Sequence, residues 1–254
     1  MSGKLSIVGL GPGDDRYLTR EALDALGEAT ALYGYEAYLD RIRSRAGQSR
    51  YASDNREEAE RARAALSHAA SGANVAIVSG GDPGVFAMAA SVCEEIAAGP
   101  DSWRALDVTI VPGITAMLAV AARAGAPLGH DFCALSLSDN LKPWELIERR
   151  LDAASGAGFV IALYNPVSRA RPWQLGKAFA RLARHLPGTT PVIFGRGVGR
   201  GDEAVTVTTL AGASDVPADM ATLIIIGSRE TRIIDREGRA PLVYTPRAVE
   251  EAIA

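Results

Sequence analysis

Three short glycine-containing turns carry the residue types that suit a ligand-binding site. They are GPGD at residues 11–14, SGGDP at 79–83 and PGITA at 112–116, and each follows an apolar run. Glycine lets the backbone approach a ligand without a Cβ in the way, while aspartate or threonine caps a helix or bonds to a ligand. Each turn by itself is as typical of a capped corner as of a binding site, because glycine and proline punctuate ordinary turns.

The elements around these turns alternate between strands and helices. Apolar runs predict strands at 5–10, 31–35, 75–78 and 106–111, and apolar periodicity predicts helices at 19–29, 57–70 and 85–98. Such alternation implies a parallel sheet, in which ligands bind at the carboxyl ends of the strands. We therefore expect the three turns to lie at one sheet edge.

The second half of the chain has a different order of elements. The segment 125–139 breaks the alternation and is interpreted as the passage between two domains. Beyond it we expect strands at 158–164, 191–194, 204–208 and 222–226, helices at 144–151 and 173–185, a hairpin over 233–243 and a terminal helix from Arg247. The prediction is a pair of α/β domains, residues 1–124 and 125–254.

The first glycine turn also invites a dinucleotide-binding interpretation, which would make the protein an NAD(P)-dependent oxidoreductase. Glu36, after the second predicted strand, has the position of a ribose-binding acid. The pattern fails in detail, because Asp14 replaces the third glycine of GxGxxG and Pro12 lacks an N–H that a pyrophosphate would need.

Composition excludes several classes of partner. The 254 residues carry a net charge of −3 and no lysine-rich tract, so we expect neither nucleic acid nor an anionic membrane as a partner. Cys93 and Cys133 show no paired spacing, so neither disulfides nor a cysteine metal site is expected. We see no signal peptide and no apolar run long enough for a membrane span, and we expect a cytoplasmic protein.

Polar residues of the second half add further candidates. Asn165 directly follows an apolar strand, where its amide can bind the polar edge of a ligand or simply begin a turn. His130 precedes Asp131, although neighbours on an extended chain point to opposite sides. Arg196 and Arg200 lie in a glycine-rich turn that suits carboxylates or a mobile hairpin.

Taken together, these motifs show a resemblance that no single one of them carries. GxGPGD at 9–14, SGGDP, PGITA and LYNP at 163–166, in this order and spacing, resemble the tetrapyrrole methylases of the cobalamin pathway. YNPxSxxR at 164–171 and GRxxGR at 195–200 are most similar to the members that methylate C17 of precorrin-3B and contract the ring to precorrin-4. The resemblance implies two α/β domains with S-adenosylmethionine in a cleft between them, unlike the Rossmann-type methyltransferase fold. It also implies a homodimer.

The resemblance assigns roles to individual residues. The residues implied at the methyl donor are Pro12, Gly80, Gly81, Asp82, Thr115, Ala116 and Asn165, with Ala221 and Thr222 as further candidates. Gly13 and Asp14 would border the tetrapyrrole, and Arg171, Arg196 and Arg200 would suit its acetate and propionate arms. Ring contraction needs a proton moved, for which Asp14, Tyr17 and His130 are the candidates.

Other functions are also compatible with the sequence. Within the family, a cobalt-containing substrate or methylation at another ring carbon are alternatives. A non-catalytic module that binds a tetrapyrrole or S-adenosylmethionine is a third class, because methyl transfer demands no nucleophilic residue.

Overall fold

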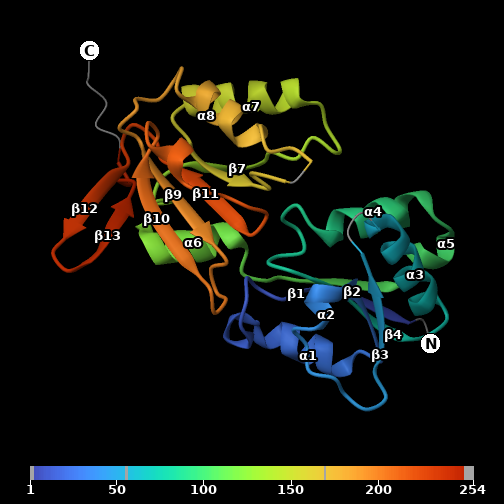
Figure 1. The fold of residues 1–254 in the computed structure, drawn as a ribbon. Helices are drawn as coiled ribbons and strands as arrows, with labels where there is room; N and C mark the ends of the chain where they lie inside the picture. Colours follow the sequence, from blue (N-terminus) through green and yellow to red (C-terminus); the bar gives the residue numbers. More distant parts are fainter. Residues whose placement is uncertain (1–2, 55–56, 169, 249–254) are drawn as a thin grey trace. The chain divides into compact units, whose positions relative to one another are not determined.

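The computed structural model describes residues 3–54, 57–168 and 170–248, which form two compact units. Unit 1 comprises residues 1–116 and unit 2 residues 117–254 (Figure 1). The domain boundary expected after residue 124 falls at the end of α6 (Ala116–Ala124), the helix with which unit 2 opens.

Unit 1 is built on a parallel sheet with strand order β3-β2-β4-β1-β5. The strands are β1 (Lys4–Gly9), β2 (Ala31–Tyr35), β3 (Ser49–Ser53), β4 (Asn74–Ser79) and β5 (Asp107–Val111). All four pairings are parallel, as the alternation predicted. Gly9 lies in register with Ser79, so β1 and β4 end side by side.

Helices cover both faces of this sheet. Leu5 and Ile7 of β1 pack against α3 and α4, whereas Val8 packs on the α1 side, because successive side chains of a strand point to opposite faces (Figure 1). The helices of unit 1 are α1 (Arg20–Glu28), α2 (Glu36–Leu39), α3 (Glu58–Ala70), α4 (Met88–Ala98) and α5 (Asp101–Arg104), with a 3-10 turn η1 (Asp15–Tyr17). The helix expected from residue 85 begins only at Met88, because Phe86 has a φ of 53° that no α-helix accepts.

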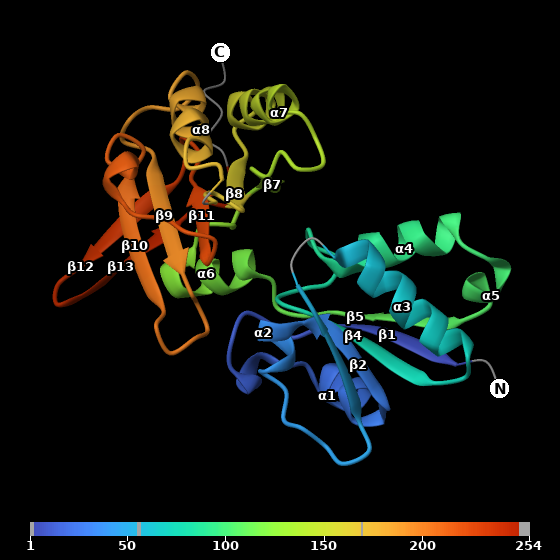
Figure 2. The same cartoon turned by 45° about the vertical axis from the view of Figure 1, so that its right-hand side comes forward.

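Unit 2 contains a mixed sheet with strand order β10-β9-β11-β8-β7. The strands are β7 (Phe132–Ser136), β8 (Val160–Tyr164), β9 (Pro191–Arg196), β10 (Ala204–Thr209) and β11 (Thr222–Ile226). Helices α7 (Trp144–Gly156) and α8 (Gln174–Leu182) pack on one face, and Val120 of α6 packs against Gly195 on β9 (Figure 2).

A small sheet completes unit 2. It joins β6 (Gly125–Ala126) to the hairpin of β12 (Arg232–Arg236) and β13 (Arg239–Tyr244), which confirms the expected hairpin, and a 3-10 turn η2 (Ala213–Asp215) follows β10. The segment 125–139 was wrongly interpreted as a mere passage, since it contributes β6 and β7. The terminal helix expected from Arg247 falls largely outside the described residues.

Candidate functional site

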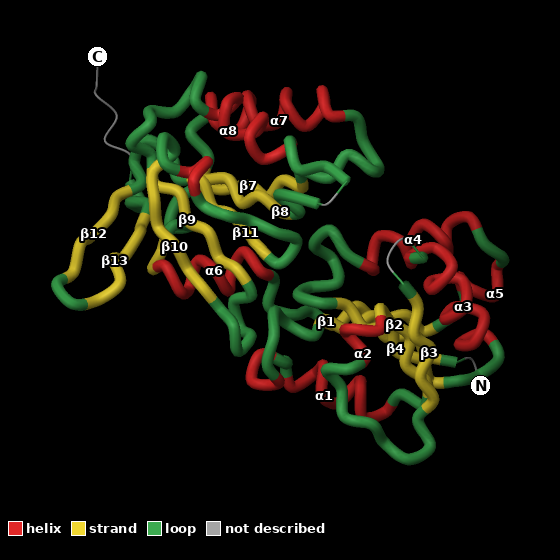
Figure 3. The backbone as a smooth tube through the Cα atoms, viewed as in Figure 1, coloured by secondary structure: helices red, strands yellow, loops and turns green. Residues whose placement is uncertain are grey.

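The three glycine turns of unit 1 meet at the carboxyl edge of the sheet. A Cβ on Gly9 would lie 2.7 Å from the nitrogen of Gly113 and 2.8 Å from the carbonyl oxygen of Gly81. Real Cβ atoms do not approach backbone so closely, so glycine is required where the turns touch. The loops that follow β1 and β4 are drawn in green in Figure 3. The structure thus brings together the turns that the sequence predicted at one edge.

Backbone hydrogen bonds tie the first turn to the second. Gly11 donates its N–H to the carbonyl of Gly81 (3.1 Å) and accepts one from the N–H of Gly81 (2.9 Å). Gly81 adopts a φ of +70°, which favours glycine. These N–H groups are therefore not available to a pyrophosphate, and only the short 3-10 turn η1 opens here, because α1 begins at Arg20. The geometry argues against the NAD(P) alternative.

Asp82 joins the second turn to the third. Its Oδ2 accepts a hydrogen bond from the N–H of Gly113 (3.0 Å), and its Oδ1 accepts one from the N–H of Gly84 (2.8 Å). Hydrogen bonds to a charged group contribute about 1.5–3 kcal/mol each when they replace water. Both carboxylate oxygens of Asp82 therefore hold the turns in place, and the residue does not cap α4, which starts at Met88.

Arg41 is a residue of this edge that the sequence analysis missed. Its Nη2 donates to the carbonyls of Leu10 (2.7 Å), Gly11 (3.1 Å) and Gly13 (2.5 Å). The guanidinium thereby fixes the first turn from the segment after α2. No motif surrounds Arg41, and only the fold brings it to the turn, so the sequence held no signal for it.

Tyr38 lies against the second turn in a similar way. A Cβ on Gly80 would lie 2.7 Å from Cζ of the Tyr38 ring. A side chain at position 80 would therefore collide with the Tyr38 ring, so glycine is needed here whether or not a ligand binds.

Thr115, which directly precedes α6, is buried.

Two proton-transfer candidates flank the first turn. Asp14 is exposed, caps η1 and accepts a hydrogen bond from the backbone N–H of Arg16 (3.0 Å). That hydrogen bond and the Arg16 side chain lower the pKa of Asp14 below its usual value. A lowered pKa makes this carboxylate a weaker base, so the position of Asp14 beside the first turn, and not its pKa, keeps it a proton-transfer candidate. Tyr17 is half-buried, and its carbonyl oxygen lies 2.8 Å from a Cβ built on Gly11.

The candidates of unit 2 gather at one edge of its own sheet. Asn165 follows β8 with a φ of 51° and donates through Nδ2 to Oγ of Ser136 (3.0 Å), which ends the neighbouring strand β7. Tyr164 accepts at its hydroxyl a hydrogen bond from the N–H of Met117 (3.1 Å) in the first turn of α6. Since β11 runs antiparallel to β8, Thr222 begins β11 at this same edge.

Asp219 organises the residues that begin β11. Its Oδ1 accepts hydrogen bonds from the N–H of Ala221 (2.9 Å) and from Oγ1 of Thr222 (2.9 Å). Its Oδ2 accepts one from Nε of Arg196 (2.9 Å), and Asp202 accepts one from Nη1 of Arg196 (2.8 Å). Arg196 is therefore held by two carboxylates of the protein itself, and its hydrogen bond lowers the pKa of Asp202.

The other predicted carboxylate-binding arginines differ from each other. Arg171 forms an ion pair with Asp139 and donates to Oδ1 of Asn140 (2.9 Å), and its hydrogen bond lowers the pKa of Asp139. The charge of Arg171, like that of Arg196, is paired with a carboxylate of the protein itself, and its contact with the substrate stays a prediction. Arg200 is exposed in the turn after β9.

His130 lies away from the edge that carries Asn165. It precedes the first residue of β7, whereas Ser136 ends that strand, so at about 3.3 Å per residue roughly 20 Å separates the two. Its Nδ1 accepts a hydrogen bond from the N–H of Asp131 (2.7 Å). The structure therefore separates His130 from the edge of unit 2 that carries Asn165, and its role in proton transfer stays a prediction.

The described part of the chain contains neither a metal-binding cluster nor a membrane-spanning helix. No group of three or more His, Cys, Asp or Glu side chains is arranged to hold a metal ion. No helix is long and apolar enough to cross a membrane. Both findings cover residues 3–54, 57–168 and 170–248.

Comparisons with known proteins agree on one family. A family model described as Tetrapyrrole (Corrin/Porphyrin) Methylases matches residues 4–214. A precorrin-3B C(17)-methyltransferase from Sinorhizobium sp is 61% identical over 247 residues, which are 97% of each chain. A probable cobalt-factor III C(17)-methyltransferase from Salmonella typhimurium is 41% identical over 96% of this chain and 98% of its own. The solved structure of the methyltransferase CobJ, 45% identical, superposes with a TM-score of 0.90 over 96% of this chain and 100% of that one.

Proposed function

Because the chain belongs to the tetrapyrrole (corrin/porphyrin) methylase family, we propose that it transfers a methyl group from S-adenosylmethionine to C17 of precorrin-3B. The ring contracts to precorrin-4 in the same reaction, as a step of cobalamin biosynthesis. The observation that carries this proposal is the 61% identity to a precorrin-3B C(17)-methyltransferase, which extends over 97% of both chains.

The chemistry of the predicted donor residues fits S-adenosylmethionine. The edge of unit 1 consists mainly of backbone groups beside Thr115, and the edge of unit 2 carries the amide of Asn165 and the hydroxyl of Thr222, which bind Ser136 and Asp219 within the unit. Neutral donors and acceptors suit the amino acid, ribose and adenine parts of this molecule, whereas a pyrophosphate would need unpaired N–H groups. The residues that we propose at the donor are Pro12, Gly80, Gly81, Asp82, Thr115, Ala116, Asn165, Ala221 and Thr222.

S-adenosylmethionine supplies, when bound, an electrophilic methyl group on a sulfonium. The chain's own residues then need to hold the two reactants close together and in line. Such positioning lowers the activation free energy of a bimolecular reaction by up to about 7–11 kcal/mol. Arg41 and Asp82 serve this purpose by fixing turns at backbone atoms. No nucleophilic side chain is required.

Ring contraction additionally needs a group that accepts or donates a proton. Asp14 is our first candidate because of its position, since it is exposed beside the first turn. Tyr17, on the same 3-10 turn, is the alternative. His130 ranks third, because it lies at the opposite end of β7 from the edge that carries Asn165.

A cobalt-containing substrate is the second candidate. It is favoured by the 41% identity to the Salmonella protein, whose name refers to cobalt-factor III. The higher identity to the precorrin-3B enzyme places the metal-free substrate first. Homodimer formation stays a prediction from the resemblance.

The test is incubation of the purified protein with methyl-labelled S-adenosylmethionine and either precorrin-3B or its cobalt-containing counterpart. We expect label at C17 by NMR and the absorbance change of a contracted ring, with faster turnover of precorrin-3B. Label without contraction would assign the rearrangement to another protein. Donor binding without label in either substrate would contradict the proposed function and favour a binding module.

A further inference from the structure

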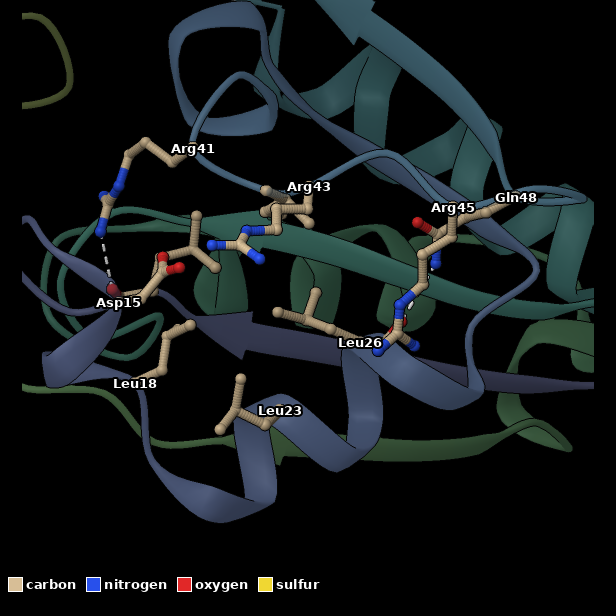
Figure 4. Close-up of a pocket in the computed structure, with 10 residues that line it drawn as sticks. Asp15, Leu18, Leu23, Leu26, Arg41, Arg43, Arg45 and Gln48 are labelled. Atoms are coloured by element: carbon tan, nitrogen blue, oxygen red, sulfur yellow. Dashed lines mark hydrogen bonds between the residues drawn. The ribbon is translucent and has the colours of Figure 1, made fainter.

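A pocket of about 140 Å³ lies in unit 1 between α1 and residues 41–48, the segment that leads from α2 to β3 (Figure 4). Four leucines and one isoleucine form its apolar lining, and Asp15, Arg41, Arg43, Arg45 and Gln48 form the polar part. Ligand pockets for whole small molecules measure about 300–1,000 Å³, so this one has room only for a chemical group of a larger ligand.

Side chains fix the 41–48 wall to its surroundings. Gln48 donates through Nε2 to the carbonyls of Leu26 (3.0 Å) and Ala29 (2.8 Å) at the end of α1. Arg50 donates through Nη2 to the carbonyl of Ile42 (2.7 Å). The pocket wall is therefore held in place before any ligand arrives, which reduces the entropy lost on binding.

The three arginines of the lining have different environments. Arg41 directs its Nη2 at carbonyls of the first glycine turn. Arg43 extends across the pocket in the direction of Asp15 (Figure 4), and Arg45 lies against α1, where a Cβ on Gly27 would be 3.0 Å from its Nη1. Within the described residues, the side chains of Arg43 and Arg45 have no hydrogen bond or ion pair, so their charges remain for a ligand.

We propose that this pocket binds one carboxylate arm of the tetrapyrrole substrate, with Arg43 and Arg45 as the groups that recognise the carboxylate. The leucines would contact the methylenes of an acetate or propionate arm, and a guanidinium matches the two oxygens of a carboxylate. Arg41 connects the pocket wall to Gly13, so the pocket adjoins the turn already proposed for the substrate. This inference rests on the proposed function and adds a subsite to it.

The test compares Arg43→Gln, Arg45→Gln and the double variant with the wild-type enzyme on precorrin-3B. Loss of a charge-assisted hydrogen bond should raise KM about tenfold in the double variant. We expect kcat and the Kd of S-adenosylhomocysteine to stay within about twofold, since the reacting groups are untouched. Asp15→Asn should lower KM, because it removes a carboxylate that competes for the arginines.

Arg20→Gln is the matched control, because it removes the same charge from a side chain of α1 that is 87% exposed. A double variant whose KM stays within about twofold of this control would overturn the inference. If the double variant keeps the wild-type KM but its activity no longer responds to added propionate, the pocket binds a separate small carboxylate. That result would also overturn the inference. Failure of the wild-type enzyme to methylate precorrin-3B would instead count against the proposed function itself.

Discussion

The two units present their candidate ligand edges in different ways. In unit 1 the edge consists of backbone turns that touch one another at Gly9, Gly81 and Gly113 and are fixed by charged side chains from outside. In unit 2 the edge consists of side chains, such as Asn165 and Thr222, that already bind other side chains of the unit. A backbone site depends on close packing and tolerates no Cβ, whereas a side-chain site can lose one group and keep its shape. Substitutions should therefore affect stability most in unit 1 and affinity most in unit 2.

Gly113→Ala should have the largest effect. Its Cβ would lie within 3.0 Å of the backbone of both other turns, and such overpacking costs about 1–3 kcal/mol or more. The free energy of unfolding in urea measures it. Gly176→Ala is the control, because a Cβ there in α8 meets no atom within 4 Å and should stabilise by about 0.5–1 kcal/mol. Equal stability of the two variants would contradict the close-packed description of unit 1.

Arg41→Gln should come next. The variant loses charge-assisted hydrogen bonds to three carbonyls and should lower the free energy of unfolding by about 2 kcal/mol. Hydrogen exchange of the backbone amides at residues 9–13 reports the loosened turn directly. Unaltered protection of these amides would show that the turn holds its shape without the guanidinium.

Asn165→Ala should weaken donor binding and, because alanine disfavours the positive φ of this residue, should also cost about 1 kcal/mol of stability. Loss of one amide contact corresponds to about a tenfold higher Kd for S-adenosylhomocysteine. Because Asn165 has a positive φ, Asn165→Gly separates the two roles of the residue. If the side-chain amide of Asn165 contacts the donor, both variants bind S-adenosylhomocysteine weakly. Wild-type affinity in Asn165→Gly would instead show that only the backbone conformation of residue 165 matters.

Arg171→Gln should have the smallest effect, mainly on stability. The ion pair lowers the pKa of Asp139 in the folded state, so its contribution is present above the unfolded pKa of a carboxyl group and is lost as pH falls through the folded value. We expect about 1 kcal/mol lower stability at pH 7 and a vanishing difference from the wild type in strong acid. A large rise in KM at unchanged stability would restore Arg171 as a substrate ligand.

Two central strands could be predicted from sequence to the residue, whereas two edge strands could not. The bounds of β2 and β11 were predicted to the residue, because central strands read as continuous apolar runs. β3 escaped notice because an edge strand with the sequence SRYAS carries little apolar signal, and β7 because it follows a turn-rich stretch.

The site divides in the same way. Glycine spacing predicted the edge of unit 1, because a parallel topology brings strand ends together whatever the side chains do. The ion pairs of Arg171 and Arg196 were not predicted, because Arg171 pairs with an acid 32 residues away and one of the two acids at Arg196 is 23 residues away in sequence. Arg41 was hidden for the same reason, because its carbonyl partners lie 28 to 31 residues before it.

The most direct test of the central claim, that fixed turns of unit 1 form part of a methyl-donor site, is calorimetric titration of Asp82→Asn with S-adenosylhomocysteine. The substitution keeps the size of the side chain but places an amide where a carboxylate oxygen now accepts a backbone N–H. We expect a Kd at least about tenfold higher than that of the wild type, and no change in Asp101→Asn, whose carboxylate side chain is 97% exposed. Equal affinity of Asp82→Asn and the wild type would contradict the account.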